Sequence, residues 1–149
     1  MKDNDELSKL RRAALNLLAR RDHSVHELIQ KLKNRAYSVS SAQMIVEELL
    51  QAGYINESRF TENYIHWRSG KGYGPLRISA ELQSRGILPE MIAEHLQITD
   101  NAWFALAQKI WQKQFKGKLP DDLKLRARQI RFLQYRGFTR EQIENVIKI

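Results

Sequence analysis

The sequence predicts an all-α protein built from three tandem three-helix repeats, about nine helices in all. Apolar residues recur at helical spacing along almost the whole chain, and no window shows the sustained period of two expected of a strand. A short sequence motif typical of a helix end also occurs three times, at intervals of 50 and 51 residues. In each copy a leucine leads four residues later to a small residue and an apolar one, at Ala36-Tyr37, Gly86-Ile87 and Gly137-Phe138.

The first predicted repeat covers residues 1–55. Its first helix has an apolar stripe, and its second opens with the capping box formed by Ser24 and Glu27. The third helix is expected to begin near Ser40 and to stop at Gly53. Ala36 is less suited than glycine to a positive φ, so we expect the turn before this third helix to differ from the corresponding turns of the other repeats.

The second predicted repeat covers residues 56–98. Asn56 is a favourable N-cap, and the helix that follows places three aromatic residues on one face, namely Phe60, Tyr64 and Trp67. A glycine-rich loop, 70–75, ends with a proline at the first position of the next helix. That helix closes at Gly86, and Pro89 opens the last helix of the repeat.

The third predicted repeat covers residues 99–149. Its first helix begins near Thr99 and Asp100 and ends at the break over 117–120. Either Asp121 or Asp122 caps the next helix, which ends at Gly137. The last helix opens with a capping box formed by a threonine and a glutamine, Thr139 and Gln142.

The net charge of +8 is concentrated in the last third of the 149-residue chain. Residues 1–50 carry a net charge of +2, residues 51–100 carry −1 and residues 101–149 carry +7. Such a field attracts phosphate or an acidic protein surface, although basic side chains also simply solvate exposed helices. There is no cysteine, no apolar run long enough for a membrane span and no readable signal peptide, so we expect a cytoplasmic protein.

The sequence predicts neither a catalytic site nor a metal or cofactor site. His23 and His26 have no further histidine or cysteine nearby to complete a zinc site. The loop with Gly70, Gly72 and Gly74 lacks the spacing and the preceding strand of a nucleotide-binding loop. It is either a flexible connection or, with neighbouring basic residues, a contact for an anion or a partner carboxylate.

Basic residues provide the candidate binding sites. The middle repeat offers Arg68, Lys71 and Arg77 beside the glycine-rich loop. The third repeat offers a second cluster, in which Arg128, Arg131 and Tyr135 can share a helix face; its arginines are Arg126, Arg128, Arg131 and Arg136. Trp103, Trp111 and Phe132 follow helical spacing and are assigned to the core in preference to base stacking.

Several short sequence motifs, which together span almost the whole chain, resemble those of one family. They are residues 17–24 (LLARRDHS), 53–60 (GYINESRF), 71–75 (KGYGP), 131–133 (RFL) and 135–138 (YRGF). In this order they resemble the RecX regulators of the recombinase RecA. Asn56 stands where this family often has aspartate, and it remains a competent cap.

The resemblance implies an elongated, curved row of three three-helix repeats and no enzymatic activity. It also implies a partner, the RecA filament on single-stranded DNA, in whose helical groove the protein would lie. A row of repeats in a groove needs no symmetry, so we expect a monomer. Inhibition of the RecA ATPase, strand exchange and coprotease activity would follow, with effects on recombination, DNA repair and the SOS response. The protein could also bind DNA weakly by itself. The alternative function is a helical module that binds DNA directly and acts without a recombinase.

Overall fold

The computed structural model describes residues 2–35 and 38–148, and this part of the chain contains nine α-helices and no strands. The all-α prediction is therefore confirmed. Three helices form the first group, three the second and three the third. Their bounds are α1 Lys2–Arg20, α2 Val25–Lys33, α3 Val39–Gln51, α4 Glu57–Gly70, α5 Pro75–Ser84, α6 Pro89–His95, α7 Asn101–Phe115, α8 Leu123–Arg136 and α9 Arg140–Val146.

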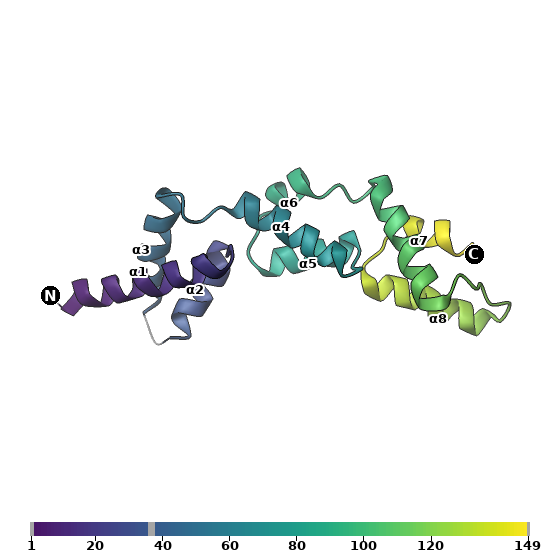
Figure 1. Cartoon of the computed structure of the whole chain (residues 1–149), viewed down its shortest axis with the longest axis horizontal. Helices are drawn as coiled ribbons and strands as arrows, with labels where there is room; N and C mark the ends of the chain where they lie inside the picture. The colour runs from purple at the N-terminus through teal and green to yellow at the C-terminus, as the bar shows by residue number, and fades with distance from the viewer. Residues whose placement is uncertain (1, 36–37, 149) are drawn as a thin grey trace.

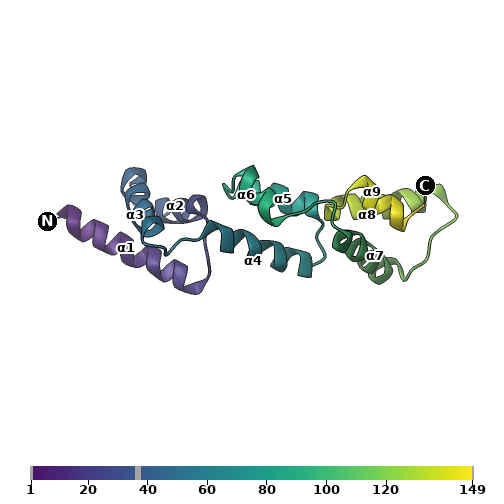
Figure 2. The same cartoon turned by 90° about the horizontal axis from the view of Figure 1, so that it is seen from above.

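The three groups lie side by side in an elongated row, which both views show (Figures 1 and 2). The first group lies at one end, and α7, α8 and α9 lie at the other. Helix-to-helix packing is concentrated within each group, as expected for repeats that pack on their neighbours through small junctions. No helix in the described part of the chain is both long and apolar enough to cross a bilayer.

Each group of helices has its own apolar core, and Leu106 of α7 packs against both the second and the third. The first core includes Leu10, Leu28 and Ile45; the third is built around Trp111 and Phe138. The second core is completed by a residue of the next repeat, Trp103 of α7. Trp103 and Trp111 are 8% and 6% exposed, as predicted for core residues. Phe132 is half-buried and packs edge-on against Phe115.

The predicted helix caps are present, with one exception. Both capping boxes form, and Asn56, Asp100 and Asp122 cap α4, α7 and α8. Helix α3 begins at Val39, one residue before the expected Ser40, and its N-cap is Ser38, whose hydroxyl accepts a hydrogen bond from the Ser41 amide. Ala36 and Tyr37 lie outside the described residues, as does the turn expected there.

His23 is a buried polar residue at the start of α2, and it is only 1% exposed. Its Nδ1–H donates to the carbonyl of Arg21 at 3.0 Å, and its Nε2 accepts from the Lys31 ammonium at 2.9 Å. Both ring nitrogens are thus used by the neutral imidazole. Burial lowers the pKa of His23, and the nearby cations of Arg21 and Lys31 act in the same direction.

We expect the stability of the fold to fall on mild acidification because of His23. Its pKa is lower in the folded state than the value of about 6.5 in an unfolded chain. Its contribution is therefore fully present above about pH 6.5 and is lost as the pH falls below that value. Urea denaturation between pH 7.5 and 5.5 measures the effect. A His23→Asn variant should be less stable at pH 7.5 but less sensitive to pH; parallel curves for the two proteins would contradict this assignment.

Candidate functional site

The glycine-rich loop before α5 meets the C-terminal end of α8, and the two segments touch through their backbones. The amide of Gly74 donates to the carbonyl of Arg136 at 2.7 Å, and the amide of Leu76 donates to the carbonyl of Gly137 at 2.9 Å. A Cβ atom on Gly74 would lie 2.6 Å from the Gly137 carbonyl, so the approach requires glycine. The loop is therefore a junction between the second and third repeats.

Three arginines surround the ring of Tyr73 at this junction. Their guanidinium carbons lie 3.9, 4.4 and 5.0 Å from the ring centroid, and they belong to Arg68, Arg77 and Arg136. We call these four residues the Tyr73 cluster. Its cation–π contacts continue to Tyr135, which lies 4.8 Å from Arg77. Three helices, α4, α5 and α8, thus contribute arginines to one aromatic ring.

Glu81 compensates part of the positive charge of the Tyr73 cluster. It accepts two hydrogen bonds from Arg68, both at 2.8 Å, and one from Arg77 at 3.4 Å. The hydroxyl of Tyr64 also donates to Glu81, at 3.0 Å. Burial alone would raise the pKa of Glu81, but hydrogen bonds from Arg68 and Tyr64 keep it below its usual value. Burial, aided by the bond to this carboxylate, raises the pKa of Tyr64 to about 12.

The residues predicted in the middle repeat thus have different environments. Arg68 and Arg77 are partly buried and form intramolecular contacts. The side chain of Lys71 is exposed, while its backbone carbonyl accepts a hydrogen bond from Arg136 at 3.1 Å. The sequence reasoning missed Glu81 and Tyr73 as the residues that organise this cluster. The four-residue spacing of Arg77 and Glu81 on one helix was the available signal.

The predicted basic cluster of the third repeat divides in a similar way. Arg126 is half-buried and donates to the carbonyl of Pro120 at 2.7 Å, and Arg136 belongs to the Tyr73 cluster. Arg128 and Arg131 are exposed and form no ion pair in the described part of the chain. With Tyr135, which is 73% exposed, they share a helix face by spacings of three and four residues. We call Arg128, Arg131 and Tyr135 the α8 face.

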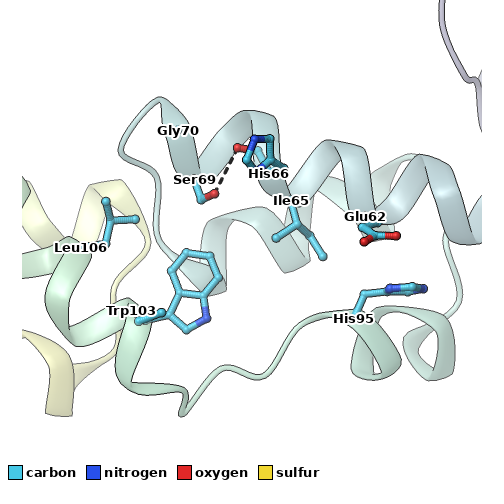
Figure 3. Close-up of a pocket in the computed structure, with 9 residues that line it drawn as sticks. Glu62, Ile65, His66, Ser69, Gly70, His95, Trp103 and Leu106 are labelled. Carbon is cyan, nitrogen blue, oxygen red and sulfur yellow. Dashed lines mark hydrogen bonds between the residues drawn. The ribbon is translucent and has the colours of Figure 1, made fainter.

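A cleft of about 490 Å³ separates α4 from α7 (Figure 3). Its lining is largely apolar and includes Ile65, Trp103 and Leu106, with a few polar side chains at its edge. One of these, His95, forms a hydrogen bond with Ser58 at 2.8 Å. Among the described residues there is no group of three potential metal ligands, here or elsewhere. The other polar residues that line the cleft are Glu62, His66 and Ser69.

The first and second repeats meet through polar side chains. Arg59 of α4 forms a bidentate pair with Asp22, with both N–O distances at 2.7 Å. Arg85, at the end of α5, lies 3.7 Å from Glu27, and its backbone carbonyl accepts a 2.8 Å hydrogen bond from Ser24. This junction therefore combines ion pairs with a hydrogen bond from a side chain to the backbone, whereas the other one also includes direct bonds between backbone groups.

An elongated row of helical repeats with an exposed basic face is typical of the helical-repeat proteins that present one long surface to a partner. Family models for the first, second and third three-helix domains of RecX match residues 11–49, 56–96 and 101–147. The regulatory protein RecX of Pseudomonas entomophila is 39% identical over 93% of this chain and 89% of its own length. That of Pseudomonas fluorescens is 38% identical over 96% and 92%. The chain belongs to the RecX family of regulatory proteins.

Solved structures agree on the fold. The crystal structure of RecX from Lactobacillus salivarius superposes with a TM-score of 0.80 at 22% identity, over 96% of this chain and 95% of the other. A second crystal structure of a regulatory protein RecX gives a TM-score of 0.81 at 20% identity, over 97% and 73%. The predicted arrangement of three three-helix repeats is confirmed.

Proposed function

We propose that the protein binds the RecA filament on single-stranded DNA and inhibits the RecA ATPase, strand exchange and coprotease activity. In this way it would restrain recombination, DNA repair and the SOS response in the cytoplasm, without a cofactor and without catalysis of its own. Membership of the RecX family and the exposed basic α8 face support the proposal. The proposal depends most on the exposure of Arg128 and Arg131 on the α8 face, because cations that form no ion pair in the described part of the chain are free to bind a partner.

The shape of the protein supports a role on a filament. An elongated row of repeats can contact several identical subunits at once, and linked contacts raise the overall affinity without one very strong site. A monomer is sufficient for this arrangement, because the repeats themselves provide the multiple contacts.

We assign different roles to the basic residues. Arg128, Arg131 and Lys71 are exposed and would contact the partner directly. The remaining four would act mainly by holding the helices in register, and they are Arg68, Arg77, Arg126 and Arg136.

Binding measured at one near-physiological salt concentration tests the proposed partner. We expect the protein to bind RecA–DNA filaments at least tenfold more tightly than bare single-stranded DNA in fluorescence anisotropy. We also expect it to reduce the filament's rate of ATP hydrolysis. Equal or tighter binding to bare DNA, with a steep loss of affinity at higher salt, would favour a direct DNA-binding module. The charge of +7 over residues 101–149 is the observation that supports this alternative.

A further inference from the structure

We propose that a second cleft, at the junction of the first and second repeats, binds an aromatic side chain that lies beside carboxylates in an acidic segment of a partner protein. The cleft has a volume of about 430 Å³ and is formed where residues 21–27 meet α4 and the end of α5. This inference goes beyond the proposed function and does not rest on it, because it concerns another junction and a ligand defined only by its chemistry.

The cleft has an aromatic wall on α4. Phe60 stacks on Tyr64 with ring centroids 5.9 Å apart, and Trp67 packs edge-on against Tyr64 at 5.6 Å. Trp67 is 52% exposed, whereas Trp103 and Trp111 are 8% and 6% exposed. A large aromatic ring left half in water at the edge of a cleft is the type of residue that dominates protein–protein contacts when a partner covers it.

The charged side chains around the cleft are layered. The two carboxylates, those of Asp22 and Glu27, are only 18% and 16% exposed. The arginines that line the cleft are more open to solvent: Arg21 is 49% exposed and Arg85 33%. Arg59, which pairs with Asp22 beside the cleft, is 53% exposed. The surface offered to a ligand is therefore positive, although acidic groups lie beneath it. Each guanidinium has five N–H donors, more than its bonds to Asp22 or Glu27 use. The remaining exposed N–H groups favour a further planar carboxylate, supplied by the partner.

The same layering favours a protein segment over a nucleic acid strand. The two arginines and two carboxylates that line the cleft balance, and Arg59 beside it brings the local charge to only about +1 at neutral pH. A strand of phosphates requires a continuous basic track, and the carboxylates beneath the arginines would repel it. One apolar side chain with flanking carboxylates matches both the aromatic wall and the positive edge. The volume of the cleft lies in the range usual for sites that enclose a small ligand.

Short peptides test this inference without any recombinase. The probe is a capped hexapeptide with one phenylalanine flanked by aspartates. One control peptide has alanine in place of phenylalanine, and the other has lysines in place of the aspartates. Calorimetry and tryptophan emission of the full chain should give a Kd below about 1 mM for the probe and at least tenfold weaker binding for both controls.

Two variants locate the binding. Trp67→Ala should weaken binding of the probe at least tenfold, and Tyr54→Ala, which removes another exposed aromatic residue outside the cleft, should leave the Kd unchanged. Far-UV circular dichroism checks that both variants keep their helix content. Equal affinity for all three peptides, no binding of the probe at 10 mM, or an unchanged Kd for Trp67→Ala would overturn the proposal. An oligothymidylate serves as the competing ligand. If it displaces the probe, binds more tightly and loses affinity for Trp67→Ala, the choice of a protein ligand is overturned.

Discussion

Replacing Gly137 by alanine is expected to lower the free energy of unfolding by about 2–5 kcal/mol, because two separate costs add at this position. Gly137 ends α8 with φ at +100°, a conformation that a Cβ atom disfavours. The new Cβ would also lie 2.3 Å from the Cβ of Arg77 and 2.6 Å from its backbone nitrogen. Backbone cannot move aside as the end of a flexible side chain can, so the junction itself would have to open.

Alanine substitutions at three other glycines measure the backbone strain and the steric clash separately. Gly53 has φ at +84° with open space around it, so alanine there should cost about 1 kcal/mol from backbone strain alone. Gly74 has φ at −89° but faces the Gly137 backbone, so alanine there should cost about 1–3 kcal/mol from the clash alone. Gly70 ends α4 without strain or neighbours, and alanine there should be neutral or stabilising by up to about 1 kcal/mol.

Urea denaturation followed by circular dichroism measures all four variants under the same conditions. The expected order of stability is Gly70→Ala, Gly53→Ala, Gly74→Ala and then Gly137→Ala. A loss for Gly137→Ala no larger than that for Gly53→Ala would show that the contact with Arg77 contributes nothing to the fold.

Reversing the charge of both arginines on the α8 face is expected to abolish the proposed inhibition of RecA. Arg128→Glu with Arg131→Glu changes the local charge by four units on a face that meets the proposed partner directly. Loss of two charge-assisted contacts, together with new repulsion, should weaken binding to the filament at least 100-fold. Both side chains are exposed, and glutamate is a good helix former, so the helix content should be unchanged. The measurement is the rate of ATP hydrolysis by RecA filaments at increasing concentrations of the variant.

The first repeat provides a matched control. Lys9 and Arg12 of α1 are exposed, lie three residues apart as Arg128 and Arg131 do, and form no ion pair in the described part of the chain. Lys9→Glu with Arg12→Glu makes the same change in total charge at the far end of the row. We expect this control to lose much less inhibition. Full inhibition by the α8 variant would remove the α8 face from the mechanism, and equal losses in both would indicate a general charge effect.

Local signals made most of the fold predictable. Helix caps are encoded within three or four residues, which is why Ser24, Asn56 and Thr139 could be identified by reading along the chain. Ser38 was missed because serines at 38, 40 and 41 offer similar signals, and only the backbone conformation selects one of them.

The contacts between repeats could not be predicted in the same way. Gly74 and Gly137 meet across 63 residues of sequence, and each is locally explained as a turn or a helix end. The role of Arg77 depends on this meeting, since its guanidinium donates to the carbonyl of Tyr135 at 3.1 Å. Sequence therefore identifies which side chains are basic, but the packing of the repeats decides which of them remain free for a partner.

The two junctions also predict how stiffness is distributed along the molecule. Dissolved salt screens the ion pairs of Asp22 with Arg59 and of Glu27 with Arg85, but it has little effect on the amide-to-carbonyl contacts between Gly74 and α8. Rising ionic strength would thus loosen the end that carries α1, α2 and α3 while the remaining two-thirds move as one body. On a filament, such a molecule would detach in stages, with its amino-terminal arm lifting first and the rest remaining seated.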